Sequence, residues 1–389
     1  MPTMVVIGYR PDLDQALQRR GISPHYIVQA PSAPPADRGF THVADMENAQ
    51  EILRAVLAAR IGDAAGVLTV HEMGVFGATY LRQQLGLPGN TDSRAALYFR
   101  DKFLQKSRLP SQVRRARCRY ASHDTSFTDL AGDLGEVFVV KPATGAGSLR
   151  TNIVRSPQEY ARALELFSGR SDVEIVAESF IDAPEVYMDG IWQDGSLRWS
   201  SMTRYHLSPL SAAQGSILAA HLLDRGRHPE LFDQMETLAD QVLGSLGAPD
   251  CVFHMEAFTE EAGLTFGECA IRLPGALSPQ INQLTFGVDL FDAEISLALG
   301  EDITQPLEHA TPERLHGYIL LRRSDGGTLT REDFERRFRF DDIEYSSSPD
   351  TPLGPYGKVG HAIVSDPDEL ELQKTIEEIV RFNEVGTGE

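Results

Sequence analysis

Two glutamates in the stretch 251–272 have the spacing of a metal site. Read as two strands joined by a turn centred near Ala262, the stretch predicts a β-hairpin in which Glu256 lies opposite Glu268. Their Cβ atoms would be roughly 4.5–5.5 Å apart. Opposed like charges call for a cation, and Mg²⁺ commonly takes one or two carboxylates together with water and phosphate oxygens. A surface hairpin with solvated glutamates explains the spacing about equally well.

Other polar side chains share the faces of these strands. Because side chains alternate along a strand, one face carries Val252, His254, Glu256 and Phe258, and the other strand contributes Leu264, Phe266, Glu268, Ala270 and Arg272. Arg272 could hold an anion beside the metal. His254 could contact a substrate, although a buried structural histidine is about as good an interpretation.

A strand followed by small residues is compatible with a phosphate site. An apolar run reaches Lys141, and the loop 143–148 has small residues whose N–H groups can approach a phosphate. The loop lacks the GxxxxGK[ST] spacing of a P-loop, and alone it is a weak signal. Lys102 and Lys106 share one face of a helix predicted over residues 91–109, where a solvated face is the simpler interpretation.

Composition bounds the class of protein. At 389 residues the chain is long enough for two or three domains. The formal net charge of −20 argues against a nucleic acid or an anionic membrane as a general partner. No apolar run approaches the roughly 20 residues that span a bilayer, and the first residues lack a signal-peptide pattern, so we expect a cytoplasmic protein. The three cysteines, without CxxC spacing, are expected to be reduced structural thiols.

The chain begins with the pattern of a parallel α/β unit. Strand patterns alternate with helix patterns at residues 4–8, 13–20, 25–29, 47–60 and 66–70. His71 and Glu72 follow the last of these strands, where open α/β sheets often bind ligands, although a helix cap is the simpler interpretation. Further on, residues 203–228 predict a long irregular loop, and residues 354–357 predict a turn.

The order of these pieces resembles the ATP-grasp superfamily, and most closely its L-amino-acid ligase branch. The resemblance covers about residues 88–300. Its motifs, in order, are Asp101-Lys102, Phe138-Val139-Val140-Lys141-Pro142, Glu178-Ser179-Phe180-Ile181 with Glu185, and Phe253-His254-Met255-Glu256 with Phe266-Gly267-Glu268-Cys269-Ala270-Ile271-Arg272. Each motif is modest alone, but the ordered set is fairly specific.

The resemblance implies a mixed α/β and α+β chain with the ATP-grasp fold. Four segments are expected: an N-terminal parallel α/β domain at 1–90, a linker helix region at 91–130, a central lid at 131–190, and a C-terminal catalytic α+β subdomain at 191–389, with an α+β tail from about 310. ATP would be clamped between two lobes.

The resemblance also implies which residues bind ATP. The phosphates would be bound by Lys102 and Lys141 and covered by the loop residues Thr144, Gly145, Gly147 and Ser148. Around the adenine and the ribose, the implied residues are Glu178 at the adenine amino group, Ser179, Phe180 and Ile181 along the adenine edge, and Glu185 at the ribose.

Glu256 and Glu268 match the Mg²⁺ carboxylates of the family, the same pair that the hairpin spacing selects. Many members carry an asparagine as a further metal ligand where this chain has Ala270. Amino-acid ligases of the branch often lack that asparagine too. A second Mg²⁺ would therefore be less fully ligated here.

The implied chemistry joins a small-molecule carboxylate to an amine. The carboxylate attacks the γ-phosphate of ATP to give an acylphosphate and ADP, and the amine then displaces phosphate. Lys141 and Arg272 are the implied catalytic residues, and the candidate substrate contacts are His254, Glu72 and Arg272. The substrates are expected to be amino acids or similar molecules, a carrier-bound amine stays open, and relatives suggest a homodimer.

Two other functions stay open. A biotin-carboxylase-like or purine-pathway-like ATP-grasp enzyme, acting on bicarbonate or formate, would share the core motifs. A regulatory module that binds a nucleotide without catalysis is the alternative of another class. Retention of both lysines, both glutamates and Arg272 argues against the regulatory module.

Overall fold

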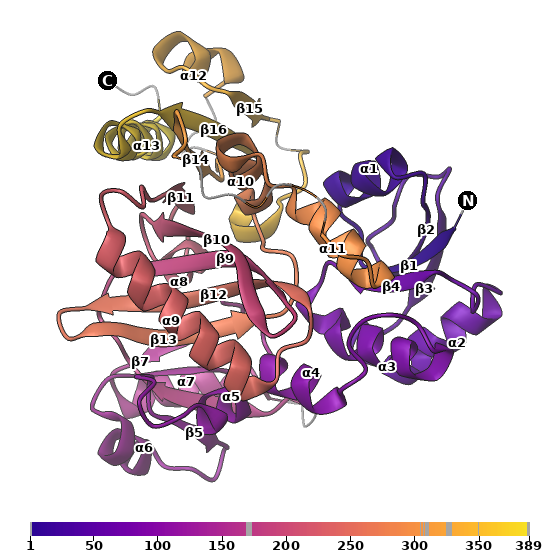
Figure 1. Ribbon diagram of the computed structural model, residues 1–389. Coiled ribbons are helices and arrows are strands. Elements are labelled where there is room, and N and C mark those ends of the chain that lie inside the picture. Colours follow the sequence, from indigo (N-terminus) through magenta and orange to yellow (C-terminus); the bar gives the residue numbers. More distant parts are fainter. Residues whose placement is uncertain are drawn as a thin grey trace.

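The computed structural model of the protein describes residues 2–168, 173–303, 305, 307, 311–323, 329–348 and 350–386. Its largest element is an eight-stranded antiparallel sheet (Figure 1). A four-stranded parallel sheet lies beside it, and a small antiparallel sheet lies at one of its edges. Strands of the C-terminal tail form its other edge. None of the described helices has the length and apolar character needed to cross a membrane.

The N-terminal part alternates strands and helices as predicted. Its elements are β1 (Thr3–Ile7), α1 (Pro11–Arg19), β2 (Ser23–Gln29), β3 (Gly39–Val43), α2 (Ala49–Ala58), β4 (Gly66–Thr69), the short 3₁₀ helix η1 (Glu72–Gly74) and α3 (Val75–Leu85). The four strands are parallel, in the order β3-β2-β1-β4.

Both faces of the parallel sheet are covered. Met4 and Val6 of β1 belong to the core formed with α1 and with α11 (Leu290–Leu299), whereas Val5 and Ile7 belong to the core formed with α2 and α3. An all-parallel sheet needs such cover on both sides. Because α11 comes from far along the chain, it ties the N-terminal sheet to the rest of the molecule (Figure 1).

The single helix predicted over residues 91–109 is wrong. The structure has two helices, α4 (Ser93–Arg100) and α5 (Lys102–Arg108), separated at Asp101. Asp101 has an extended conformation, and its carboxylate accepts a hydrogen bond from the backbone N–H of Leu104 at 2.8 Å. A side-chain cap of this kind begins a new helix rather than continuing the old one.

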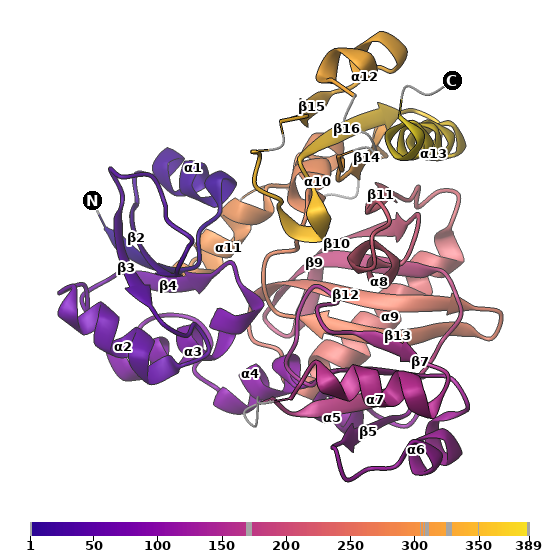
Figure 2. The same cartoon turned by 180° about the vertical axis from the view of Figure 1, so that it is seen from behind.

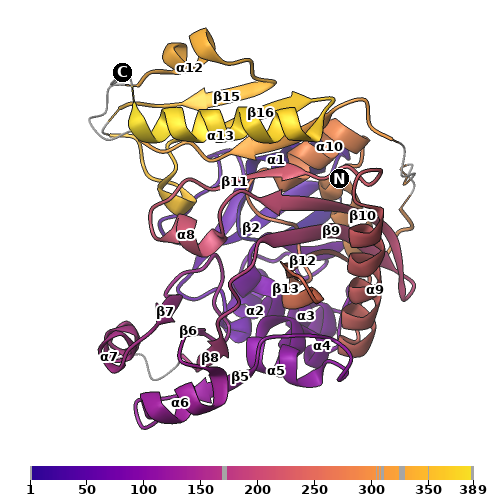
Figure 3. The same cartoon turned by 90° about the vertical axis from the view of Figure 1, so that its left-hand side faces the viewer.

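The small antiparallel sheet carries two helices on one face (Figure 3). Its elements are β5 (Cys118–Ala121), α6 (Phe127–Leu134), β6 (Phe138–Pro142), β7 (Asn152–Val154), α7 (Pro157–Glu165) and β8 (Ile175–Ser179), and the strand order is β5-β8-β6-β7. The sheet takes in residues 118–121 and ends at residue 179, because β5 pairs with β8. Its span therefore differs from the 131–190 predicted for the lid.

The large sheet has the strand order β13-β12-β9-β10-β11-β14-β16-β15. Its strands are β9 (Glu185–Gln193), β10 (Ser196–Tyr205), β11 (Ala219–Leu222), β12 (Cys251–Glu260), β13 (Gly263–Ala270), β14 (Leu315–Ile319), β15 (Asp342–Tyr345) and β16 (Gly360–Asp366). The remaining helices are α8 (Pro209–Ala213), α9 (Pro229–Leu246), α10 (Ser278–Phe286), α12 (Arg331–Arg337), η2 (Pro355–Gly357) and α13 (Glu369–Val385).

Two helices cover different parts of the large sheet. Apolar residues of α9 form one core with β9, β12 and β13, and those of α13 form another with β11, β14 and β16. The long loop predicted over residues 203–228 is wrong, since β10 continues to Tyr205 and α8 and β11 follow. Elements of four or five residues are too short to leave a readable period in the sequence.

Candidate active site

A large cavity lies where the three sheets meet. Its volume of about 620 Å³ is within the range of pockets that hold small ligands and cofactors. The residues predicted for the site that line it are Glu72, Lys102, Lys141, Gly145, Gly147, Ser148, Glu178, Ser179, Phe180, Ile181, Glu185, His254, Glu256, Glu268 and Arg272. Thr144 does not line it, and its carbonyl instead accepts a hydrogen bond from Arg100.

A β-bulge sets the register of the two opposed glutamates. The hairpin pairs Glu260 with Gly263 at its turn, so unbroken pairing would put Gly267 opposite Glu256. The register shifts next to Glu256, and Glu268 becomes its partner, as the sequence predicts. Gly267 is the extra residue of the bulge, and an added Cβ there would lie 3.0 Å from the carbonyl oxygen of Glu256.

The same bulge changes which side chains share a face. The sequence predicts Phe266 on the same face as Glu268, but Phe266 is fully buried in the core that contains Met255 and Ala257. One extra residue reverses the alternation of side chains on that strand. The predicted shared face therefore holds only from Glu268 onward, and Glu268 and Arg272 both line the cavity.

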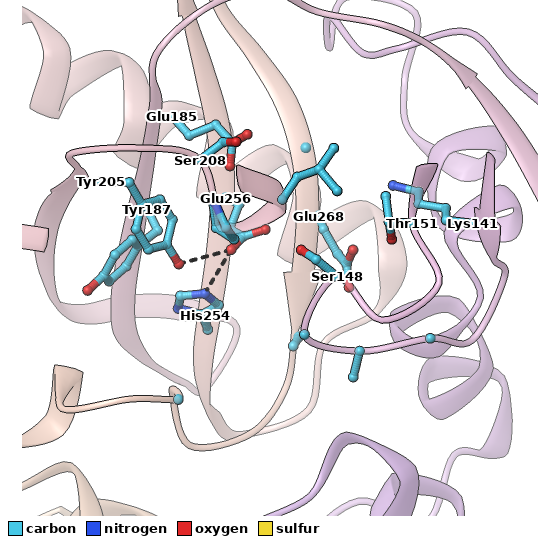
Figure 4. A pocket seen from close by; sticks show the side chains of 18 of the residues that line it. Lys141, Ser148, Thr151, Glu185, Tyr187, Tyr205, Ser208, His254, Glu256 and Glu268 are labelled. Atoms are coloured by element: carbon cyan, nitrogen blue, oxygen red, sulfur yellow. Dashed lines mark hydrogen bonds and ion pairs between the residues drawn. The ribbon is translucent and has the colours of Figure 1, made fainter. Parts of the chain in front are cut away.

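Three carboxylates reach the cavity from neighbouring strands. Glu185, Glu256 and Glu268 come from β9, β12 and β13 (Figure 4). Burial and the charge of Glu256 raise the pKa of Glu185 to about 8. Among the described residues, no three His, Cys, Asp or Glu side chains form a ready-made metal site. Two carboxylates completed by water and phosphate oxygens nevertheless fit Mg²⁺.

The two lysines predicted to bind phosphate are held by carboxylates. Nζ of Lys102 lies 3.2 Å from Oε1 of Glu268 and donates a hydrogen bond to the carbonyl of Gly145 at 2.6 Å. Nζ of Lys141 lies 2.8 Å from Oε2 of Glu178. Burial lowers the pKa of Lys102. Burial acts likewise on Lys141, but Glu178 and Glu268 outweigh it and raise the pKa of that lysine.

Glu178 is clamped between two lysines. Besides Lys141, it binds Lys106, whose Nζ lies 2.9 Å from Oε1. Burial favours the neutral acid, but the two lysines outweigh it and lower the pKa of Glu178 to about 2. Lys106 also donates to the carbonyl of Gly267 at 2.7 Å, so the solvated face expected for it is wrong. The contact of Glu178 with the adenine amino group stays a prediction.

His254 joins Glu256 to a fully buried aspartate. Its Nδ1 lies 2.7 Å from Oδ1 of Asp189. Its Nε2 lies 3.4 Å from Oε1 of Glu256 (Figure 4). Burial would lower the pKa of His254, but the hydrogen bonds with Asp189 and Glu256 raise it to about 9. Asp189 also accepts hydrogen bonds from Ser278 and Asn282. This network fixes the orientation of Glu256.

Arg272 is bound by Glu72, which follows the N-terminal sheet. Nε of Arg272 donates to one carboxylate oxygen of Glu72, and the other oxygen lies 3.3 Å from Nη1 of Arg100. Arg100 in turn donates to the carbonyl of Thr144 in the loop after β6. The side chains of Glu72 and Arg100 are only 6% and 1% exposed. A buried chain of charges therefore links the arginine to the small-residue loop.

Sequence reasoning missed several residues of the cavity. Tyr205 donates to Glu256 at 3.1 Å, Arg10 donates to the carbonyls of Pro274 and Ala276, and Tyr356 reaches the cavity from the tail. Two features of the sequence indicate further residues of the site. A glycine inside a strand pattern indicates a bulge, and an aspartate inside the apolar run 185–193 indicates a buried, hydrogen-bonded charge. These features point to Gly267, which lines the cavity, and to Asp189, which binds His254 from outside it.

No family model matches the chain. The L-arginine-specific L-amino acid ligase of Bacillus subtilis is 22% identical over 267 residues, which are 67% of this chain and 63% of the ligase. The crystal structure of an L-amino acid ligase from Bacillus licheniformis gives a TM-score of 0.78 at 17% identity and covers 98% of both chains. The chain has the ATP-grasp fold.

Another ATP-grasp structure comes from a carboxyaminoimidazole ribonucleotide synthase of Aspergillus clavatus, complexed with ATP. It gives a TM-score of 0.75 at 16% identity, covering 98% of this chain and 99% of that one. The chain spans 63% and 53% of the lengths of the two curated relatives that it matches. Proteins named for different reactions share this fold, so the fold confirms the prediction of architecture but does not select the reaction.

Proposed function

We propose that the protein is an ATP-dependent carboxylate–amine ligase, which forms an amide or peptide bond through an acylphosphate and releases ADP and phosphate. The observation that carries the proposal is the placement of Glu256 opposite Glu268, beside Lys102 and in one cavity with Arg272. Phosphoryl transfer relies on positioning and on stabilising negative charge, and these groups supply both. Amino acids are the expected substrates, because the matched relative is an L-amino acid ligase.

One end of the cavity, which we call the phosphate end, contains Lys102, Lys141 and the loop 145–148 and would hold the nucleotide. Lys102 and Lys141 are the candidate phosphate ligands, and residues 145–148 of the loop after β6 line the same cavity. Glu185 is the candidate ribose contact, and the segment 179–181 is the candidate adenine contact. Glu256 and Glu268 would hold Mg²⁺, which when bound neutralises charge on the phosphate groups.

The other end of the cavity, which we call the acid end, contains Arg272 and its partner Glu72 and would hold the substrate carboxylate that is activated. Arg272 orients this carboxylate so that one oxygen attacks the γ-phosphorus, and the bond from that phosphorus to the bridging oxygen of ADP breaks. The amine nitrogen then attacks the acyl carbon, the bond to the phosphate oxygen breaks, and the amine loses a proton. Arg272 and Lys141 stabilise the negative charge that develops in these steps. Glu72 and His254 remain candidate substrate contacts.

A carboxylase that acts on bicarbonate is the second candidate. It is favoured by the likeness to the carboxyaminoimidazole ribonucleotide synthase, whose structure covers 98% of this chain. The same phosphate end would serve both reactions. Release of ADP that bicarbonate stimulates, without added amino acids, would identify this alternative.

Analysis of the nucleotide products tests the proposal. The protein is incubated with ATP, Mg²⁺ and pooled amino acids, and the mixture is examined by mass spectrometry. We expect ADP, phosphate and a new mass equal to two amino acids minus one water. AMP with pyrophosphate would mean adenylation and would contradict the acylphosphate route. Binding of ATP without carboxylate-dependent turnover would favour a nucleotide-binding module instead.

A further inference from the structure

A turn in the C-terminal tail brings a tyrosine into the cavity. Among the described residues beyond residue 300, those that line the cavity are Tyr318, Pro355 and Tyr356. Tyr318 is buried in β14, whereas Tyr356 sits in the short helix η2, on a segment that approaches α8 from the tail (Figures 2 and 3). Tyr356 is therefore the point at which the tail reaches over the proposed reaction centre.

The backbone at Tyr356 has an unfavourable conformation. Its φ of 58° and ψ of 23° place it in the left-handed region, which bulky residues with a Cβ rarely adopt. Such a conformation persists only where the surroundings fix it, and it often marks a functional position. The sequence offers Gly354 and Gly357 as neighbours, yet the left-handed position inside the turn is filled by a tyrosine.

The turn is held rigidly by backbone hydrogen bonds. Gly354 N–H donates to the carbonyl of Lys358 at 2.9 Å, and Gly357 N–H donates to the carbonyl of Gly354 at 3.0 Å. The following residue, Val359, donates to the carbonyl of Leu321 at 2.9 Å and so anchors the turn beside β14. The strained residue is thus presented by a fixed frame and not by a free loop.

The side chain of Tyr356 points at both parts of the proposed site. An added Cβ at Gly147, in the loop after β6, would lie 3.8 Å from the Tyr356 hydroxyl oxygen, so the hydroxyl faces that loop. The ring packs against the core of the tail. Burial, together with the charges of Glu256, Glu185 and Glu268 against that of Arg272, raises the pKa of Tyr356 to about 12. Tyr356 lines the same cavity as the loop 145–148 and Arg272.

We propose that Tyr356 seals the cavity between the loop 145–148 and the acid end, and thereby protects the acylphosphate from water. This inference rests on the proposed ligase function. If water enters, its oxygen attacks the acyl carbon, the bond to the phosphate oxygen breaks, and the acid returns with inorganic phosphate. The net result is hydrolysis of ATP without an amide. A broad ring with a polar tip is suited to exclude water while meeting a polar loop.

The test measures how much ADP is formed for each amide bond. The full-length protein is given ATP, Mg²⁺, pooled amino acids and hydroxylamine in large excess over the amino acids, so that this small amine traps the acylphosphates as hydroxamates. ADP and hydroxamate are both quantified for the parent protein and for Tyr356→Phe, Tyr356→Ala and Tyr356→Gly. The control is Leu353→Ala, since Leu353 is 64% exposed on the same segment and does not line the cavity.

We expect Tyr356→Ala and Tyr356→Gly to raise the ratio of ADP to hydroxamate several-fold, while Tyr356→Phe, which keeps the ring, stays near the parent value. The glycine variant also removes the backbone strain, which offsets part of the stability lost with the ring. A purely structural role would lower both products together and leave the ratio unchanged. An unchanged ratio in the alanine and glycine variants, matching Leu353→Ala, would overturn the inference and leave the ligase proposal standing. A parent protein that makes no hydroxamate would remove both.

Discussion

The two ends of the cavity hold their charges differently. At the phosphate end, the lysines are already paired with carboxylates: Lys102 with Glu268, and both Lys106 and Lys141 with Glu178. At the acid end, one carboxylate, Glu72, lies between Arg272 and Arg100. The first end therefore requires added cations before it accepts a polyanion, whereas the second can accept a carboxylate as it stands. Substitutions at the two ends should therefore change different kinetic parameters.

The largest expected effect comes from removing a carboxylate at the phosphate end. Glu268→Ala should lower ADP formation on the order of 10²–10³-fold, because the proposed metal loses a ligand and charge on the phosphoryl group is less well stabilised. The fold should persist, which circular dichroism would show. Glu261→Ala is the matched control, since Glu261 is exposed in the turn of the same hairpin. Unchanged turnover in Glu268→Ala would refute the metal assignment.

The two lysines that clamp Glu178 provide a sharper contrast. In Lys141→Met the KM for ATP should rise on the order of 10–100-fold, as expected for loss of a charged hydrogen bond. Lys106 has structural partners, Glu178, the carbonyl of Gly267 and the ring of Phe266. We therefore expect Lys106→Met to lower the melting temperature and to leave the KM for ATP within about threefold. Equal rises in KM for the two variants would show that both lysines bind phosphate.

A smaller effect is expected at the acid end. Glu72→Gln should lower kcat/KM for the acid substrate by about tenfold, because Arg272 and Arg100 lose the charge that positions them, while the KM for ATP changes little. Glu47→Gln is the matched control. Glu47 binds the same Arg100 at 2.9 Å, but its side chain is 45% exposed. If Glu72→Gln acted mainly on the KM for ATP, the two ends of the cavity would not act independently.

A buried carboxylate outside the cavity is expected to change stability and to have the smallest effect on turnover. Burial raises the pKa of Glu294 to about 7 from the ordinary 4.5, although Arg82 opposes the rise. The folded state therefore binds a proton that the unfolded state releases between pH 4.5 and 7, so stability falls as pH rises through this window. Glu294→Gln should reduce this fall in unfolding free energy by up to roughly 3 kcal/mol, measured by urea denaturation at pH 5 and pH 8. An identical pH slope in the variant would rule out this role.

The pKa of Glu178 predicts the opposite dependence of stability on pH, in a lower pH range. Its pKa of about 2 in the folded protein lies below the ordinary 4.5, so its contribution is present above that value and is lost as pH falls toward 2. The difference between the two carboxylates comes from their partners. Glu178 has two lysines within 3 Å, whereas Glu294 makes no ion pair with Arg82 within 4 Å.

The phosphate end was largely predictable from the sequence because its groups lie on short, recognisable segments. Lys141 ends a strand motif, and the register of Glu256 and Glu268 follows from one hairpin. The bulge at Gly267 was not foreseen, although the correct pairing depends on it. The break at Asp101 was also missed, because a side-chain cap in the middle of a helical pattern leaves little trace in the periodicity.

The acid end could not be predicted in the same way, because tertiary folding assembles it. Glu72, Arg272 and Tyr356 are far apart in the sequence, and no local pattern shows that they line one cavity. Glu72 was a weak candidate because a residue after a strand is usually a cap. Tyr356 was read only as part of a turn, since its left-handed backbone and its approach to Gly147 emerge from the fold.

The most direct test of the acylphosphate route is transfer of an oxygen isotope. Pooled amino acids labelled with ¹⁸O in their carboxyl groups are incubated with the protein, ATP and Mg²⁺, and the released phosphate is analysed by mass spectrometry. Attack by a carboxylate oxygen on the γ-phosphorus predicts one ¹⁸O atom in phosphate for each amide formed. Label in AMP, or amide formation with unlabelled phosphate, would contradict the route and the roles proposed for Arg272 and Lys141.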